Sequence, residues 1–219
     1  MKKILMAFVV RLKFQKRSAL KFVSRTIPHS GGYNTPQLAE TLFPKLVLGV
    51  IPMILLLAGC VNMPENIKPV DNFNIERYLG KWYEIARLDH SFERGLTSVS
   101  AEYSLRSDGG LRVVNRGYSK KENKWKDIEG KGYFVNRKDE GFLKVSFFGP
   151  FYGSYVVFDL DRENYSYALV CGPDKSYLWL LARNPLMADD LKKRLVDKAA
   201  SLGFDTEKII YVQQDGSRF

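Results

Sequence analysis

The sequence predicts an all-β protein: an eight-stranded antiparallel up-and-down β-barrel with one C-terminal α-helix and a short final strand. Two observations carry the prediction. Short segments rich in Val, Tyr, Phe and Trp recur from Trp82 onward, and these residues suit a pleated, half-buried surface. Turn-forming sequences separate the segments. Strands joined by hairpins leave two exposed sheet edges unless the sheet closes, so a barrel is expected.

The strands are expected where aromatic and β-branched residues alternate with polar ones. The turns between them contain Gly, Pro, Asp and Asn, as in residues 107–110, 137–141, 161–164 and 172–174. Eight strands enclose a barrel just wide enough for packed side chains or one small ligand. In chain order, the expected strands are 82–88, 98–105, 111–118, 126–135, 142–148, 154–159, 167–171 and 177–183.

The helix is expected over residues 185–203. Asn184 offers a capping side chain, Pro185 suits the first helical position, and Gly203 ends the helix. One helix face should pack on the barrel, because its apolar residues repeat at helical spacing. These residues are Leu191, Leu195, Ala199 and Leu202. A last strand over residues 208–212 should lie beside the first.

The positive charge of the chain belongs to its N-terminal part. The formal net charge is +10, and nine of the 34 Lys and Arg residues but one of the 24 Asp and Glu residues lie within residues 1–59. The remainder is nearly neutral, which argues against a nucleic-acid partner. A basic segment before an apolar run is typical of membrane targeting.

That apolar run covers residues 46–58, which carry no charge, and it ends in Leu57-Ala58-Gly59-Cys60. It is shorter than the ~20 residues of a spanning helix and suits the core of a signal peptide. The ending resembles the lipobox of bacterial lipoproteins. The resemblance implies cleavage before Cys60, acylation of its sulfur and of the new amino terminus, and anchoring by several acyl chains. The alternative is a buried Cys in an apolar helix.

Three regions follow from these features. Residues 1–59 are expected to be a leader, residues 60–74 a lipidated tether, and residues 75–214 the barrel with its helix. The leader is long for a lipoprotein. Either translation starts downstream of residues 1–44 or the leader is extended, and in both cases residues 1–44 should be absent from the working protein; the alternative is a cytoplasmic basic arm.

Three motifs point to one family. Gly80-Lys81-Trp82 resembles the Gly-x-Trp signature that opens the first strand of lipocalins. Arg183 matches the late arginine of that family. Asp161 followed by Tyr165 or Tyr167 is a looser match to its Asp-x-Tyr motif. Together with the lipobox, the chain looks most like the outer-membrane lipoprotein lipocalins, and it is also similar to apolipoprotein D.

The resemblance covers about residues 75–210, and segments 147–153 and 168–173 strengthen it. It implies a closed barrel in which the first and last strands are neighbours. The guanidinium of Arg183 should then stack on the indole of Trp82 and close one end, as a structural contact. The signature residues are Gly80, Trp82 and Arg183.

Alternation counted from Trp82 points Glu84 and Ala86 into the barrel. A one-residue register error would reverse such an assignment. Small inward residues such as Ala101 favour an open cavity, although the same side chains could fill a solid core. The candidate ligand-binding residues are Ala86, Val99, Ala101, Tyr103, Asn115, Phe134, Val145, Phe147, Tyr155 and Trp179.

These features predict a binding protein and not an enzyme: a periplasm-facing, lipid-anchored lipocalin of the outer membrane. It would store or transport a fatty acid or lysophospholipid during envelope maintenance or stress. No catalytic residue, cofactor, metal site or nucleic-acid partner is expected, and a homodimer is left open. The alternatives are a lipid-modifying enzyme using Cys171 or the loop with His90, and a structural lipoprotein with a filled barrel.

Overall fold

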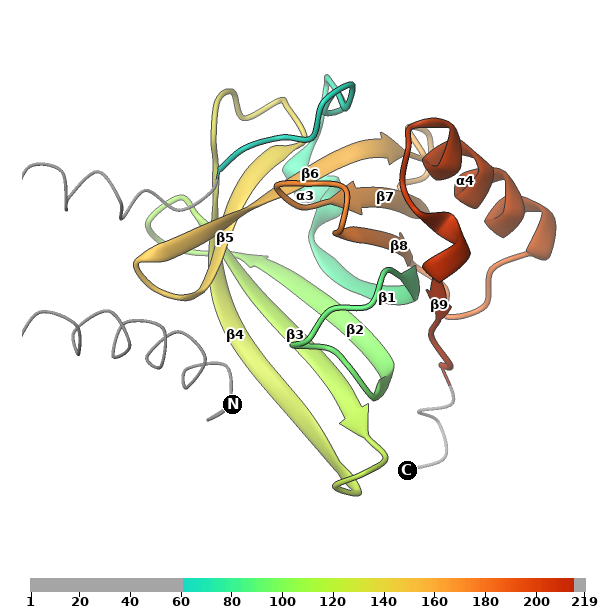
Figure 1. Ribbon diagram of the computed structural model, residues 1–219. Helices are drawn as coiled ribbons and strands as arrows, with labels where there is room; N and C mark the ends of the chain where they lie inside the picture. The colour runs from blue at the N-terminus through green and yellow to red at the C-terminus, as the bar shows by residue number, and fades with distance from the viewer. Residues whose placement is uncertain (1–60, 215–219) are drawn as a thin grey trace, which may run out of the picture. The chain divides into compact units, whose positions relative to one another are not determined.

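The predicted fold class is confirmed: the computed structural model is a closed antiparallel barrel with one helix outside it (Figure 1). It describes residues 61–214, so the leader over residues 1–59 and Cys60 lie outside the described residues. Eight strands form the barrel and a ninth joins its edge. The strands are β1 (Gly80–Arg87), β2 (Leu96–Leu105), β3 (Leu111–Ser119), β4 (Lys124–Phe134), β5 (Phe142–Phe148), β6 (Phe151–Leu160), β7 (Tyr167–Cys171), β8 (Leu178–Ala182) and β9 (Ile210–Tyr211).

The barrel closes through β1, which pairs with both β2 and β8. The contact with β2 is short, because only Gly80–Tyr83 are in register with Ser100–Tyr103. Beyond this point the C-terminal segment fills the seam between the two strands. Val212 donates its backbone N–H to Ile85, and Gln214 Nε2 donates to the carbonyls of Glu84 and Val99 at 2.7 and 2.9 Å. The last residues of the described chain therefore complete the barrel wall.

One end of the barrel is closed by a short helix, α3 (Ile75–Tyr78), whose first turn is capped by the side chain of Asn74. Trp82 is fully buried there, and its Nε1 donates to the carbonyl of Tyr78 at 2.8 Å. The guanidinium of Arg183 lies 4.0 Å from the centre of the Trp82 ring, as the two sequence motifs predict. The loops that join β1 to β2 and β7 to β8 lie at the opposite, open end.

Residues 61–74, which we expect to be a tether, pack against the barrel. Their buried apolar side chains include Ile67, Val70 and Phe73. The backbone of Val70 donates to the carbonyl of Val157 and accepts from the N–H of Gly141. The segment has almost no regular secondary structure, yet its apolar residues belong to the core.

The helix α4 (Asp189–Ser201) lies outside the barrel and buries Leu195 and Ala199. It starts four residues later than expected, because Asn184 does not cap it. The Oδ1 atom of Asn184 instead accepts the backbone N–H of Leu186, which makes a turn before the helix. The helix covers a hydrophobic cluster on the outer faces of β1, β7 and β8.

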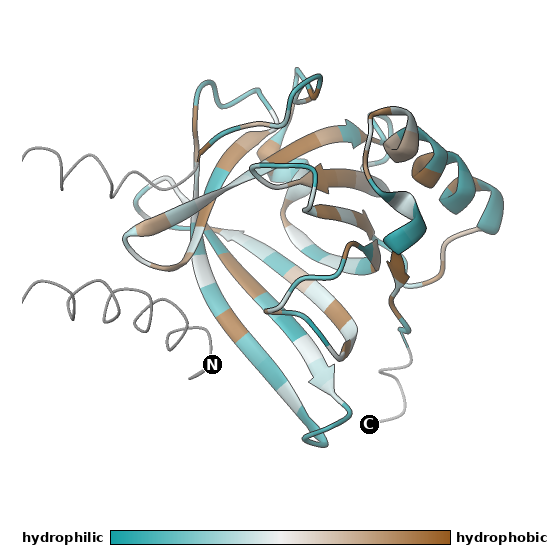
Figure 2. Ribbon diagram, viewed as in Figure 1, coloured by the Kyte–Doolittle hydropathy of each residue, from teal (hydrophilic) through white to brown (hydrophobic). Residues whose placement is uncertain are grey.

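A second hydrophobic cluster lies inside the barrel toward its closed end and includes Trp82, Tyr103 and Val157. Figure 2 shows hydrophobic residues concentrated in β6, β7 and β8, whereas β2, β3 and β4 are mostly hydrophilic or intermediate. The interior is thus densely packed at one end, which leaves the other end for a cavity.

Within residues 61–214, no helix has the length and the apolar character that crossing a bilayer requires.

Candidate functional site

The barrel encloses a cavity of about 280 Å³, close to the lower limit of roughly 300–1,000 Å³ for small-molecule sites. Its walls are mainly apolar and come from strands around the barrel. It reaches the open-end loops through Phe92, which is half exposed, and through Tyr177. Among the described residues that line it, none is Lys or Arg. The cavity therefore offers apolar walls and no basic side chain to a ligand.

Most of the candidate ligand-binding residues lie where alternation places them. Each of the following lines the cavity, although whether any of them contacts a ligand stays a prediction. They are Val99, Ala101, Tyr103, Asn115, Val145, Phe147, Tyr155 and Trp179.

Two candidates lie elsewhere. A β-bulge shifts the register of β1 against β8 between Glu84 and Ala86, so one residue is inserted into the alternation. Ala86 consequently faces the hydrophobic cluster under α4 and not the cavity, which corrects the expected inward orientation. Phe134 lies toward the closed end, where it packs edge-on against Phe73 with ring centres 6.4 Å apart.

Three tyrosine hydroxyl groups join the cavity to the closed end. The hydroxyl of Tyr155 lies 2.7 Å from that of Tyr78 and 2.8 Å from that of Tyr103. Burial raises the pKa of Tyr78 well above its ordinary value, and it raises the pKa of Tyr155 as well. All three groups are therefore neutral and satisfy one another.

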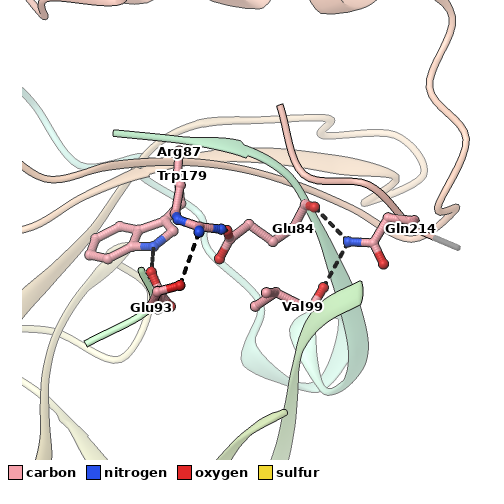
Figure 3. A network of polar contacts seen from close by, with 6 residues as sticks. All are labelled: Glu84, Arg87, Glu93, Val99, Trp179 and Gln214. Atoms are coloured by element: carbon pink, nitrogen blue, oxygen red, sulfur yellow. Dashed lines mark hydrogen bonds and ion pairs between the residues drawn. The ribbon is translucent and has the colours of Figure 1, made fainter. Parts of the chain in front are cut away.

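A buried ionic network lies at the opposite end of the cavity (Figure 3). Glu84 Oε1 and Arg87 Nη1 are 2.5 Å apart, and Arg87 Nη2 donates to the backbone carbonyl of Glu93 at 3.0 Å. The Nε1 atom of Trp179 donates to Glu93 Oε2 at 3.1 Å. The exposed fractions of Glu84, Arg87 and Glu93 are 3%, 2% and 7%. These contacts fix the β1–β2 loop, which carries Glu93, to the barrel wall.

The two carboxyl groups of the network share the charge of one arginine. Burial and the neighbouring charge of Glu93 raise the pKa of Glu84 to about 8, and the guanidinium of Arg87 opposes this shift. Burial also raises the pKa of Glu93, against the hydrogen bond from Trp179. At neutral pH the pair therefore retains a proton.

Sequence reasoning did not identify this network as a site. The one signal in the sequence that could have indicated the network is the alternation of β1, which points the side chain of Glu84 into the barrel. Arg87 and Glu93 resemble ordinary polar residues at the end of a strand and in a loop. Only the tertiary fold shows that the loop folds back over the cavity and buries them.

The two residues considered for catalysis, Cys171 and His90, are both packed among apolar or aromatic side chains. Cys171 is buried in the hydrophobic cluster under α4, and burial raises the pKa of its thiol to about 12. The ring of His90 is stacked between those of Phe92 and Tyr177, at centroid distances of 5.4 and 4.8 Å. Burial and the charge of Arg87 lower the pKa of His90 to about 4, so its ring is neutral.

A closed antiparallel barrel with an apolar internal cavity, a plugged end and an external helix defines a class of small-ligand-binding barrels. Within that class, the model of a lipocalin-like domain matches residues 73–214. The chain therefore belongs to the lipocalin family.

The chain is 61% identical over 159 residues to an outer membrane lipoprotein Blc of Vibrio cholerae, covering 73% of this chain and 93% of the relative. It is 49% identical over 176 residues to the protein of that name from Escherichia coli K12, covering 80% and 99%. It is 31% identical to mouse apolipoprotein D over 151 residues, which cover 66% of this chain and 78% of that one. These similarities place the chain among the lipid-anchored outer membrane lipoproteins of the family.

Solved structures agree on the fold. Insecticyanin from the tobacco hornworm Manduca sexta superposes with a TM-score of 0.55 and 23% sequence identity. The match covers 69% of this chain and 86% of that structure. At this level of identity, the likeness shows the shared barrel alone.

Proposed function

We propose that this lipocalin binds one lipid, a fatty acid or a lysophospholipid, in its barrel cavity and stores or transports it at the periplasmic face of the outer membrane. The observation that carries the proposal is the apolar cavity, which is closed at the Trp82 end and reaches the loops at the other. A single acyl chain fits such a shape, with its polar end at the open loops.

The energetics support an ordinary carrier affinity. Burying a ~16-carbon chain at about 0.8 kcal/mol per methylene gives a gross gain near 12 kcal/mol. Association and ordering costs begin at about 4 kcal/mol. The remainder is at most about 8 kcal/mol, which corresponds to roughly micromolar affinity at the tightest. That strength allows both loading and release.

The anchor belongs to this proposal. Acylation of Cys60 would tether the barrel to the membrane immediately before Val61, the first described residue. Because residues 61–74 pack on the barrel, the tether would be shorter than its sequence suggests. The barrel would then remain close to the membrane surface that supplies its ligand.

The environment of the two reactive side chains favours a carrier over an enzyme. The Cys171 thiol faces the core under α4 and is held in its protonated form, while the neutral His90 ring lies within an aromatic stack. Replacement of Cys171 by Ala should leave lipid binding unchanged, whereas a catalytic thiol would lose all turnover.

The direct test is native mass spectrometry of the full chain purified without added lipid, followed by denaturing extraction. A co-purified fatty acid or lysophospholipid, at about one per chain or one per dimer, would support the carrier function. A ligand-free mass, with no uptake of added lysophospholipid, would overturn it and favour the filled-barrel alternative.

A further inference from the structure

We propose that the open end of the cavity contains a subsite for an ammonium group, formed by the carboxylates of Glu84 and Glu93 beside the rings of Phe92, Tyr177 and Trp179. The inference rests on the proposed function and adds the charge of the ligand's polar end. It predicts a preference for lipids that carry an amine over lipids of equal chain length that carry only hydroxyl or carboxylate groups.

The first argument is the position of the charges. Glu84 and Glu93 line the cavity, whereas Arg87, with an exposed fraction of 2%, is not among the lining residues. It bonds to Glu84 Oε1 and to the Glu93 backbone. A ligand that enters the barrel therefore meets carboxylate oxygens and not the arginine.

The second argument is the unused bonding capacity of the cavity wall. Glu93 is 93% buried, and the one side-chain hydrogen bond described for its carboxyl group is the one that Oε2 accepts from Trp179. On β3, the buried Oδ1 of Asn115 has no partner within the described part of the chain. Buried polar atoms left unpaired cost about 1–3 kcal/mol each, and a polar ligand group would satisfy them.

The third argument is the aromatic surface beside the carboxylates. Phe92, Tyr177 and Trp179 line the cavity at this end, and the His90 ring holds them in a stack. The ring centres of Tyr177 and Trp179 are 6.1 Å apart. Aromatic faces attract ammonium groups through their quadrupoles, and desolvated examples contribute about 2 kcal/mol. Carboxylates next to aromatic faces are the chemistry that recognises a lipid cation.

The charge balance agrees with this reading. The mutual repulsion of Glu84 and Glu93 is relieved by a retained proton, because burial and this repulsion raise the pKa of Glu84. Arg87 on β1 is the cation that faces the pair, and the neutral Tyr103 on β2 adds no charge. An ammonium group would replace the proton, so binding leaves no net charge in the buried site. A carboxylate would instead add a negative charge that Arg87 and the retained proton do not balance.

The experiment compares the affinities of ligands whose alkyl chains have the same length. It uses the full-length protein after bound lipid has been removed. The probes are 14-carbon lysophosphatidylethanolamine, lysophosphatidylglycerol, myristic acid and tetradecylamine, titrated calorimetrically. We expect the ethanolamine lipid to bind at least ten times more tightly than the glycerol lipid. Equal affinities of these two lipids would overturn the inference while leaving the carrier function intact. If no probe binds, the carrier function itself fails.

The variant Glu93→Gln separates charge from structure, because its amide oxygen can still accept the hydrogen bond from Trp179. It should reduce the preference for the ethanolamine lipid to less than threefold, with the larger loss of affinity falling on the ethanolamine lipid. Glu129→Gln, on the outer surface of β4, is the matched control and should change neither affinity. An equal loss for every probe in Glu93→Gln would show a purely structural role and contradict the subsite.

Tetradecylamine distinguishes the two sources of the cation. If it binds and loses affinity in Glu93→Gln, an ammonium group alone is sufficient, and single-chain amines are candidate ligands. If the ethanolamine lipid shows the Glu93 dependence and tetradecylamine does not bind, the phosphate also contributes, and the ligand is a zwitterionic headgroup. Both results support recognition of the ammonium group.

Discussion

Each end of the barrel contains an arginine beside buried side chains, Arg183 half-buried at the closed end and Arg87 fully buried at the open end, and the two make different contacts. At the closed end, the guanidinium of Arg183 lies over Trp82 and donates to the backbone carbonyls of Lys81 and Arg77 at 2.9 and 2.7 Å. At the open end, Arg87 lies between two carboxylic residues, and its Nε has no partner within the described residues.

The comparison separates stability from binding. The closed end satisfies its polar groups with neutral hydroxyls and backbone carbonyls, so it is complete without a ligand. The open end retains two buried carboxyl groups with raised pKa values and unpaired polar atoms. Substitutions at the closed end should therefore affect folding, while those at the open end should affect folding and ligand choice together.

The largest expected effect is at the closed end. Trp82→Ala removes a fully buried indole together with the ring under Arg183, and it should lower the free energy of unfolding by about 4–5 kcal/mol. Urea denaturation followed by far-UV circular dichroism measures this change. Trp125→Ala, on the partly exposed β3–β4 hairpin, is the control and should cost about 1 kcal/mol or less. Similar losses in the two variants would contradict the assigned role of Trp82.

At the open end, one substitution should cause a strong loss of stability that a second substitution restores. Arg87→Met leaves Glu84 and Glu93 buried without their cation, so it should destabilise the fold by about 3 kcal/mol. Adding Glu84→Gln should restore most of this loss, because it removes one of the two carboxyl groups. A double-mutant cycle on melting curves measures the coupling. Additive losses would show that the two residues do not act as a pair.

A smaller effect should appear as a dependence of stability on pH. The pKa of Glu84 rises from 4.5 to about 8 on folding, so the folded protein holds more protons than the unfolded chain between these values. Stability from this group is fully present below pH 4.5 and is lost as the pH rises toward 8. Glu84→Gln should lose this slope and be more stable than the parent at pH 8–9. Urea denaturation at a series of pH values from 5 to 9 measures this slope. If the unfolding free energy of the parent and of Glu84→Gln changed equally with pH, the assignment to Glu84 would be contradicted.

The smallest effect should come from the tyrosine cluster. Tyr155→Phe removes the hydroxyl that joins Tyr78 to Tyr103, which should cost about 1 kcal/mol because the ring and its packing remain. The melting temperature should fall by roughly 2–4 °C. Tyr152→Phe, a partly exposed ring on the same strand, should change it by less than about 1 °C. A loss as large as that of Trp82→Ala would mean that the hydroxyl cluster, and not the indole, holds the closed end.

The sequence predicts the strands well, because β-branched and aromatic residues and the turns between them are local signals. The orientation of Ala86 could not be predicted, because the bulge in β1 contains no Gly or other residue that marks it. Asn184 and Pro185 carry a valid start signal for a helix, and the chain uses the Asn184 side chain for a turn instead.

The site is predicted less completely than the fold. Alternation finds the apolar cavity wall, since burial on one face repeats along each strand. The ionic network escapes this reasoning, because Arg87 and Glu93 have the composition of a solvated loop and become buried only when the β1–β2 loop folds over the cavity. Residues 61–74 are a related case, in which two Pro and few apolar residues conceal a segment whose Ile67, Val70 and Phe73 are buried.

The C-terminal segment that fills the seam has a consequence for the order of assembly. Strand β1 leaves the ribosome first among the strands, yet its neighbours include β8, β9 and Gln214, which are synthesised last. Such pairings between distant parts of a chain are slow to form. The cavity wall is therefore unfinished until the final residues emerge, so a nascent or C-terminally truncated chain should present an open seam to chaperones and proteases.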